Sequence, residues 1–277
     1  MAETAKPSRI YQNHHLDSTR WRAVPGREGD IVIATSAKSG TTWMQAIVAH
    51  LLFPDGDFPQ PPHAMSPWVD FRPRPLDDLT ATLEAQTHRR FLKSHLPWDG
   101  LPERPGTRWI YVCRDGRDMA VSLWHHYTGY TEERMAAYNG GADRVGPPLP
   151  PPPEDFLTFW RNWCTRGWFD WESDGWPFWS HLNTAASWWT ARGREDVLMM
   201  HFADLSRDPA GCVERIAAHL GLPLTPAHRD AVVAATDFSA MKARGADYVP
   251  SGGASGKNGV EGFMRSGQNR QWEGLLA

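Results

Sequence analysis

The stretch from 31 to 52 constrains the fold more than any other part of the chain. It opens with Ile31–Thr35, a short apolar run rich in β-branched residues, which is typical of a buried parallel strand. After a polar loop, apolar residues recur at helical spacing until Pro54 ends the pattern: Met44, Ile47, Val48, Leu51 and Leu52. A strand, a tight loop and a helix in this order direct the loop amides and the helix N-terminus at one point. That point favours an anion.

The loop itself carries one full positive charge at Lys38 and hydroxyl donors at Ser39, Thr41 and Thr42. It is not the ordinary P-loop, G-x-x-x-x-G-K-[ST], in which the lysine directly follows the second glycine. Here Lys38 comes two residues before Gly40, and no glycine stands five residues before the lysine. The loop therefore predicts a phosphate-type cradle of a different kind.

Three further strand patterns follow along the chain, at 90–97, 108–113 and 196–202. Helical patterns lie between and after them, at 76–86, 118–127 and 209–220. Strands that alternate with helices predict an α/β fold with a P-loop-like, doubly wound and mainly parallel sheet, in which ligands bind at the carboxyl ends of the strands. One domain covering 1–277 is expected for this length.

Four segments lack a regular pattern. Residues 1–28 are polar and irregular, which predicts an arm over the surface, and 54–77 is a proline-rich loop. The prolines of 147–153 predict a polyproline II segment, either a stiff lead into a helix at 154–163 or a docking site for a proline-reading domain. Residues 245–262 hold six glycines, so we expect a mobile loop that closes as a lid when a ligand binds.

Composition excludes several classes of protein. The net charge of −3 and the pI of about 6.5 argue against a nucleic-acid binder or a binder of anionic membranes, which would show a basic excess. The three cysteines are scattered and fit free thiols in a reducing compartment. No signal sequence and no apolar run of about 20 residues is found, so a cytoplasmic protein is expected. Neither is there a set of residues with metal-ligand spacing, which predicts no metal site.

The second strand pattern carries two titratable groups. Lys93 and His95 are two residues apart, so they lie on the same face of a strand, and Pro97 places them at its carboxyl end. The cradle opens at the same edge. A lone histidine is more often structural than catalytic, but a cation beside it at a strand end favours a role in proton transfer.

The third strand pattern runs directly into Arg114, and Ser122 follows about one turn into the next helix. The arginine fork and the hydroxyl could hold one phosphate together. The alternative is a surface ion pair between Arg114 and Asp115 or Asp118. The residues alone leave the two readings equal.

Several segments together resemble one family. The order Lys38-Ser39-Gly40-Thr41-Thr42-Trp43 resembles the 5′-phosphosulfate loop of the cytosolic-type sulfotransferases, which use 3′-phosphoadenosine 5′-phosphosulfate (PAPS) and release PAP. Residues 93–97 are similar to the family's K-[TS]-H-L-P, and 111–122 to its Y-V-x-R-x-x-[RK]-D-x-x-V-S. Residues 263–267, followed by Trp272, are similar to F-M-R-K-G…W. Motifs in the family's order, over roughly 30–275, are far more specific than one motif.

The resemblance implies roles for these residues. His95 would be the catalytic base, Lys38 would stabilise the leaving group, and Lys93 would offset charge on the sulfuryl oxygens. The remaining cofactor-binding residues that it implies are Ser39, Gly40, Thr41, Thr42, Trp43, Arg114, Ser122, Phe202, Thr236, Phe238, Met241, Arg265, Ser266 and Gly267. Within this set Arg114, Ser122, Arg265 and Gly267 would hold the 3′-phosphate, and Trp43 would stack on the adenine.

Two departures from the family pattern bear on cofactor binding. Ser266 stands where the family has lysine, and Phe202 stands where it has an adenine-side tyrosine. They leave open a nucleotide-binding pseudoenzyme as an alternative. A Mg²⁺-dependent small-molecule kinase is a second alternative, but it would need metal ligands and usually a Walker-A loop.

The acceptor is expected to be a small molecule with a hydroxyl group, aromatic or apolar in character. Trp68, Phe71, Tyr127 and Tyr130 are candidates for its pocket. Many of the fifteen tryptophans could equally be core residues. The family's C-terminal dimer motif is not seen after Trp272, which leaves another mode of oligomerisation open.

Overall fold

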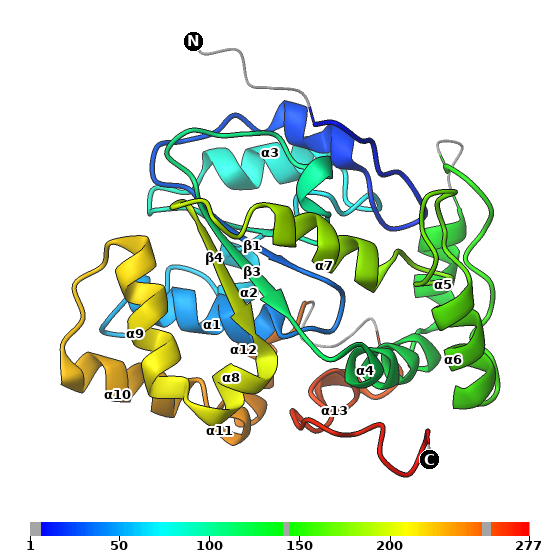
Figure 1. Ribbon diagram of the computed structural model, residues 1–277. Helices are drawn as coiled ribbons and strands as arrows, with labels where there is room; N and C mark the ends of the chain where they lie inside the picture. Colours follow the sequence, from blue (N-terminus) through cyan, green and yellow to red (C-terminus); the bar gives the residue numbers. More distant parts are fainter. Residues whose placement is uncertain (1–6, 141–143, 251–255, 277) are drawn as a thin grey trace.

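A computed structural model describes residues 7–140, 144–250 and 256–276. Its centre is a four-stranded sheet in the order β2-β1-β3-β4, and every pair is parallel (Figure 1). The strands are β1 (Ile31–Thr35), β2 (Phe91–Ser94), β3 (Arg108–Cys113) and β4 (Val197–His201). The predicted parallel α/β sheet is confirmed. The second strand is shorter than predicted, because the chain leaves the sheet after Ser94.

Helices cover both faces of the sheet (Figure 1). Alternate residues of β1 point to opposite faces, so Val32 and Ala34 join one apolar cluster while Ile31 and Ile33 join another. The second cluster packs against α1 (Thr41–Leu52), α2 (Pro62–Met65), α8 (Phe202–Arg207), α9 (Pro209–Leu220) and α10 (Pro226–Ala235). The first cluster packs against α3 (Leu76–Glu84), α4 (Gly116–Thr128), α5 (Glu132–Asn139), α6 (Phe156–Thr165) and α7 (His181–Thr190).

Local signals fix the helix ends that matter for the cavity. Gly40, with φ of 104°, precedes α1, and Pro54 lies just beyond its end. Asp115 caps α4 by accepting a hydrogen bond from the Arg117 amide. Gly221 ends α9 in the left-handed conformation that glycine adopts without strain.

The N-terminal segment differs from the predicted surface arm. Tyr11, Leu16 and Trp21 are buried in the first apolar cluster, and Trp21 belongs to a 3-10 helix, η1 (Ser18–Ala23), that precedes β1. A second 3-10 helix, η2 (Trp98–Gly100), follows β2. The segment was misjudged because its few apolar side chains are separated by polar ones and follow neither the helical nor the strand period.

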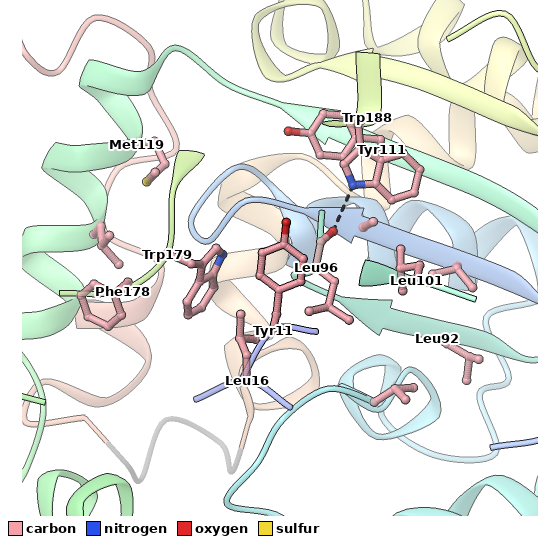
Figure 2. Close-up of a cluster of buried hydrophobic side chains, with 14 of the residues drawn as sticks. Tyr11, Leu16, Leu92, Leu96, Leu101, Tyr111, Met119, Phe178, Trp179 and Trp188 are labelled. Carbon is pink, nitrogen blue, oxygen red and sulfur yellow. Dashed lines mark hydrogen bonds between the residues drawn. The ribbon is translucent and has the colours of Figure 1, made fainter. Parts of the chain in front are cut away.

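Trp188 of the first cluster stacks on a tyrosine within the core (Figure 2). The Trp188 ring lies on Tyr111 with centroids 5.0 Å apart and planes 9° apart. Its indole N–H donates to the Leu96 carbonyl over 3.1 Å. This contact joins α7 to the segment that follows β2, directly behind His95.

The glycine-rich segment of 245–262 contains helical turns at both ends. They are α12 (Gly245–Tyr248) and α13 (Gly259–Phe263), and α11 (Phe238–Ala243) precedes them. Tyr248 and Val249 are buried in a small third cluster beside α1. Closure as a lid stays a prediction, and its central residues 251–255 lie outside the described residues. In the described part of the chain, no helix has the length and apolar character that crossing a membrane requires.

Candidate functional site

A cavity of about 1820 Å³ opens at the carboxyl ends of the strands. The sheet register explains its position, since Ala34 of β1 lies level with Ser94 of β2 and Tyr111 of β3. The segments that leave the three strands therefore meet at one edge. Of the predicted site residues, the cavity is lined by Lys38, Gly40, Thr41, Thr42, Trp43, Lys93, His95, Arg114, Ser122, Phe202, Thr236, Phe238, Met241, Arg265, Ser266 and Gly267.

Ser39 is the predicted site residue that does not line the cavity. Its side chain is fully buried beneath the loop, and its hydroxyl has no hydrogen-bond partner among the described residues. Its amide donates to the Ser36 carbonyl over 3.3 Å, which tightens the turn. Gly40 is required beside it, because a Cβ atom there would lie 2.9 Å from the Phe202 ring. The turn thereby leaves the first amides of α1 facing the cavity.

Lys38 and Lys93 approach the cavity from different strands, each over an aromatic ring. The Lys38 ammonium lies 4.3 Å from the Phe263 centroid, and that of Lys93 lies 4.6 Å from the Trp68 centroid. Burial, and then the positive charges of Arg134 and Lys93, lower the pKa of Lys38 to about 7. Burial lowers the pKa of Lys93 to about 8, although Asp70 opposes the shift. An anion bound between the two lysines would stabilise their protonated forms.

The His95 ring is held in one tautomer by β1. Its Nδ1 lies 2.8 Å from the Thr35 carbonyl oxygen and 3.1 Å from the Thr35 hydroxyl. A carbonyl oxygen only accepts hydrogen bonds, so Nδ1 carries the proton and Nε2 is the basic nitrogen. Burial, followed by the charge of Lys93, lowers the pKa of His95 well below its ordinary value. The ring is therefore neutral at pH 7 and able to accept a proton.

A second group of polar side chains lines the cavity around Arg114 and the C-terminal segment. Arg114 is buried and donates to the carbonyls of Lys38 over 3.1 Å and Gln268 over 2.6 Å. Its Nε has no hydrogen-bond partner among the described residues. The alternative of a surface pair with Asp115 is wrong, because that carboxylate accepts hydrogen bonds from Arg117 instead.

The C-terminal segment completes this part of the cavity. Gly267 has φ of 65°, and a Cβ atom there would lie 2.4 Å from the Phe238 ring, so only glycine fits. Arg265 lines the cavity and donates to the Gln271 side chain. Ser266 also lines it, with a hydroxyl in place of a charge.

Asp118 holds the C-terminal segment in place and was missed as a functional residue. It is buried, and its two oxygens accept hydrogen bonds from the backbone amides of Arg270 over 2.8 Å and Gln271 over 2.6 Å. Asp118 is the D of the motif matched to 111–122, but the pattern does not indicate that its carboxylate binds backbone amides of the C-terminal segment. Its role follows only from the structure.

An aromatic surface lies beside the cradle. The Trp43 and Phe202 rings meet edge to face with centroids 5.4 Å apart, and Phe238 and Met241 line the same part of the cavity. The Trp43 indole N–H is buried without a hydrogen-bond partner among the described residues. The Thr236 hydroxyl, in contrast, donates to the Val232 carbonyl over 2.8 Å.

The end of the cavity beside His95 has aromatic walls. Trp68 and Phe71 stack with centroids 4.6 Å apart, and Tyr130 and Trp179 complete the wall. The prediction for Tyr127 is wrong: it is fully buried behind the wall and packs against Phe178 with centroids 5.1 Å apart.

Polar groups that the sequence analysis missed also line this end: His15, His126, Arg134 and Tyr138. Arg134 donates to the Tyr138 hydroxyl over 3.1 Å and lies 4.1 Å over the Tyr130 ring. His15 belongs to the segment that was predicted to be a surface arm, and no periodic signal marked it. Among the described residues, no group of three or more His, Cys, Asp or Glu could hold a metal ion.

Comparisons with known proteins give one consistent result. The model of the sulfotransferase domain family matches residues 28–276. A glycolipid sulfotransferase of Mycobacterium bovis (strain BCG / Pasteur 1173P2) is 32% identical over 279 residues, which cover 95% of this chain and 85% of that protein. Sulfotransferase 1A1 of Rattus norvegicus is 27% identical over 252 residues, which cover 88% of this chain and 78% of that protein.

Two solved structures share the fold. Retinol dehydratase in complex with retinol and PAP has a TM-score of 0.68 and 21% identity, over 95% of this chain and 82% of that one. Mouse sulfotransferase SULT7A1 complexed with PAP has a TM-score of 0.68 and 19% identity, over 99% of this chain and 90% of that one. At these identities the likeness establishes the arrangement of the sheet and its helices.

Proposed function

Since the chain belongs to the sulfotransferase family, we propose that it moves the sulfuryl group of PAPS to a hydroxyl of a small acceptor, with His95 as the general base. The observation that carries the proposal is the meeting of Lys38, Lys93 and a neutral, tautomer-fixed His95 in one cavity. A protein that only binds nucleotide would have no use for such a base.

The cavity offers cationic groups for both charged ends of the PAPS molecule. Lys38 and the first amides of α1 suit the phosphosulfate, and Arg114 with Arg265 suits the 3′-phosphate. Buried donors without a partner among the described residues support this fit, since the Arg114 Nε and the Trp43 indole N–H would gain one from a ligand. Thr42, Ser122, Ser266 and Gly267 would contribute further donors. Phe202, Thr236, Phe238 and Met241 would border the adenine beside Trp43.

When bound, PAPS supplies the sulfuryl group and a leaving group with fixed negative charge. His95 Nε2 accepts the proton of the acceptor hydroxyl, while the Thr35 carbonyl holds the ring through Nδ1. Lys38 would stabilise the negative charge on the leaving group. The hydroxyls of Thr41 and Thr42, which line the same cavity, would assist Lys38. Lys93 offsets charge on the sulfuryl oxygens. Ser39 would hold the Lys38 loop in its turn through its amide, which donates to the Ser36 carbonyl.

The acceptor would lie between the stacked pair of Trp68 and Phe71 and the polar wall around Arg134. Such walls suit a ring that bears a hydroxyl. The mycobacterial relatives are named glycolipid sulfotransferases, so sugar hydroxyls are candidates beside phenols.

The proposal is tested with purified protein, PAPS and a panel of phenols, sterols and glycolipids, with product detection by mass spectrometry. We expect His95→Ala and Lys38→Ala each to lower kcat at least ~10²-fold, the lower range for removing a general base or an anion-stabilising group. His88→Ala and Lys242→Ala are matched controls, because neither side chain lines the cavity.

Near wild-type turnover by His95→Ala would contradict the assigned base. Loss of activity in EDTA would favour the Mg²⁺-dependent kinase instead. Binding of PAP with no transfer to any acceptor would favour the pseudoenzyme.

A further inference from the structure

Asp70 is a fully buried carboxylate on the loop between α2 and α3, and none of the steps above uses it. Its Oδ2 accepts hydrogen bonds from the Trp68 indole N–H over 2.7 Å and from the His95 amide over 3.0 Å. Its Oδ1 accepts one from the Trp21 indole N–H over 3.3 Å. Burial raises the pKa of Asp70, and these three N–H donors oppose that shift and so favour the charged carboxylate.

Two of these donors belong to the site of transfer. The His95 amide fixes the main chain of the proposed base, whose ring β1 holds from the other side. Trp68 meets the His95 ring edge to face with centroids 4.6 Å apart and stacks on Phe71. The Lys93 ammonium lies over the face of the same indole. One carboxylate therefore connects the base, the acceptor wall and the second lysine.

We propose that Asp70 is a positioning residue for sulfuryl transfer, which fixes His95 and Trp68 by hydrogen bonds and supplies the negative charge that faces Lys93. This inference rests on the proposed function, because that function assigns Lys93 a role as a cation in sulfuryl transfer. It is distinct from a purely structural role. A buried carboxylate that only joined the N-terminal segment to the loop would set stability but not the titration of Lys93.

The electrostatic part has a definite sign. Burial lowers the pKa of Lys93 to about 8, and Asp70 raises it against that effect. The other titratable groups that interact electrostatically with Lys93 are cations or histidines: Lys38, His95, His126 and Arg134. Asp70 is thus the negative group of this set. Without its charge the pKa of Lys93 falls further, so the lysine loses its proton at a lower pH.

The test is the pH dependence of kcat/KM for PAPS in Asp70→Asn, since kcat/KM reports groups of the free enzyme. We expect the part of the alkaline limb that Lys93 sets to move to lower pH by ~1 unit, the lower range for loss of a neighbouring opposite charge. The part that Lys38 sets, whose pKa is about 7, should stay in place. Asp70→Glu keeps the charge but misplaces it, so its kcat should fall while the alkaline limb stays in place.

Lys93→Arg provides the matched background, because an arginine stays protonated throughout this range. In that background Asp70→Asn should no longer move the limb. A limb that is unmoved by Asp70→Asn alone, or moved equally in the Lys93→Arg background, would overturn the electrostatic role. Wild-type protein without sulfonation activity would instead refute the proposed function, so the two failures are distinguishable.

Trp68→Phe keeps the test open should Asp70→Asn fail to fold. It retains an aromatic ring under Lys93 and removes the N–H donor to Asp70 together with part of the indole surface. We expect kcat/KM for the acceptor to fall ~10-fold, as for loss of a hydrogen bond to a charged group. The matched change Trp21→Phe removes the donor on the N-terminal side and should lower thermal stability with little effect on that ratio. An unchanged acceptor kcat/KM in Trp68→Phe would refute the positioning role.

Discussion

Asp118→Asn is expected to weaken the binding of PAP, although the substitution changes none of the residues that would contact PAP. Asp118 accepts the amides of Arg270 and Gln271 and is 2% exposed. The asparagine keeps one acceptor oxygen but turns an NH₂ group toward an amide that can only donate. Arg265 and Gly267 lie just before this anchor, so the change should loosen their end of the cavity.

The magnitude follows from the two hydrogen bonds. A hydrogen bond to a charged group contributes ~1.5–3 kcal/mol to stability. The two bonds of Asp118 together could therefore contribute up to about twice that free energy, and Asp118→Asn could lose it. The hydrogen bond from Arg114 to the Gln268 carbonyl still holds the C-terminal segment in the variant. We therefore expect the free energy of PAP binding to weaken by the contribution of about one hydrogen bond. That corresponds to an increase of ~10–100-fold in the Kd for PAP.

Isothermal titration calorimetry with PAP measures this directly. Asp115→Asn is the matched control, because that carboxylate caps the same helix but pairs with Arg117 at the surface. A folded Asp118→Asn protein that binds PAP as tightly as wild type would contradict the anchoring role of Asp118. A loss of the same size in Asp115→Asn would also refute it, since the effect would then belong to the helix end.

Two further predictions concern stability. Because the pKa values of Lys38 and Lys93 are lowered to about 7 and about 8, the unfolded chain binds more protons than the folded protein between these values and the ordinary lysine value of 10.5. Their contribution to the free energy of unfolding therefore rises with pH over that window. Thermal melts of the ligand-free protein should show a gain in Tm between pH 7 and 9 relative to the double variant Lys38→Met/Lys93→Met, and equal pH dependence would contradict the assignment. Trp188→Ala should lower the free energy of unfolding by ~3–5 kcal/mol, because this ring is fully buried on Tyr111. Trp189→Ala, at a 59% exposed neighbour, should change it by less than ~0.5 kcal/mol in the same denaturant titration, and similar losses in both would show that burial does not set the cost.

The sheet could be predicted because its determinants are local. Each strand is a short apolar run, and the stretch from β1 to α1 carries its own loop and stop signals. Lys93 and His95 could be placed at a strand end for the same reason. Their proximity to Lys38 followed from the rule that parallel strands end at one edge.

The supporting residues could not be predicted in this way. Asp70 and Asp118 act by accepting N–H groups from segments far away in the chain, and no local pattern in the sequence identifies those donors. His15 and Trp21 are buried by packing that no periodic pattern announces. Such roles depend on which segments the fold brings together, and that information is tertiary.

The most direct test of the central claim is a single-turnover reaction of the purified protein with PAPS and an accepted hydroxyl compound, followed by mass spectrometry. We expect an acceptor heavier by one SO₃ group and an equal amount of PAP, in wild type and in His88→Ala, and almost none of either product in His95→Ala. Transfer by His95→Ala at the wild-type rate, or wild-type release of PAP with no sulfonated acceptor from any class in the panel, would contradict it.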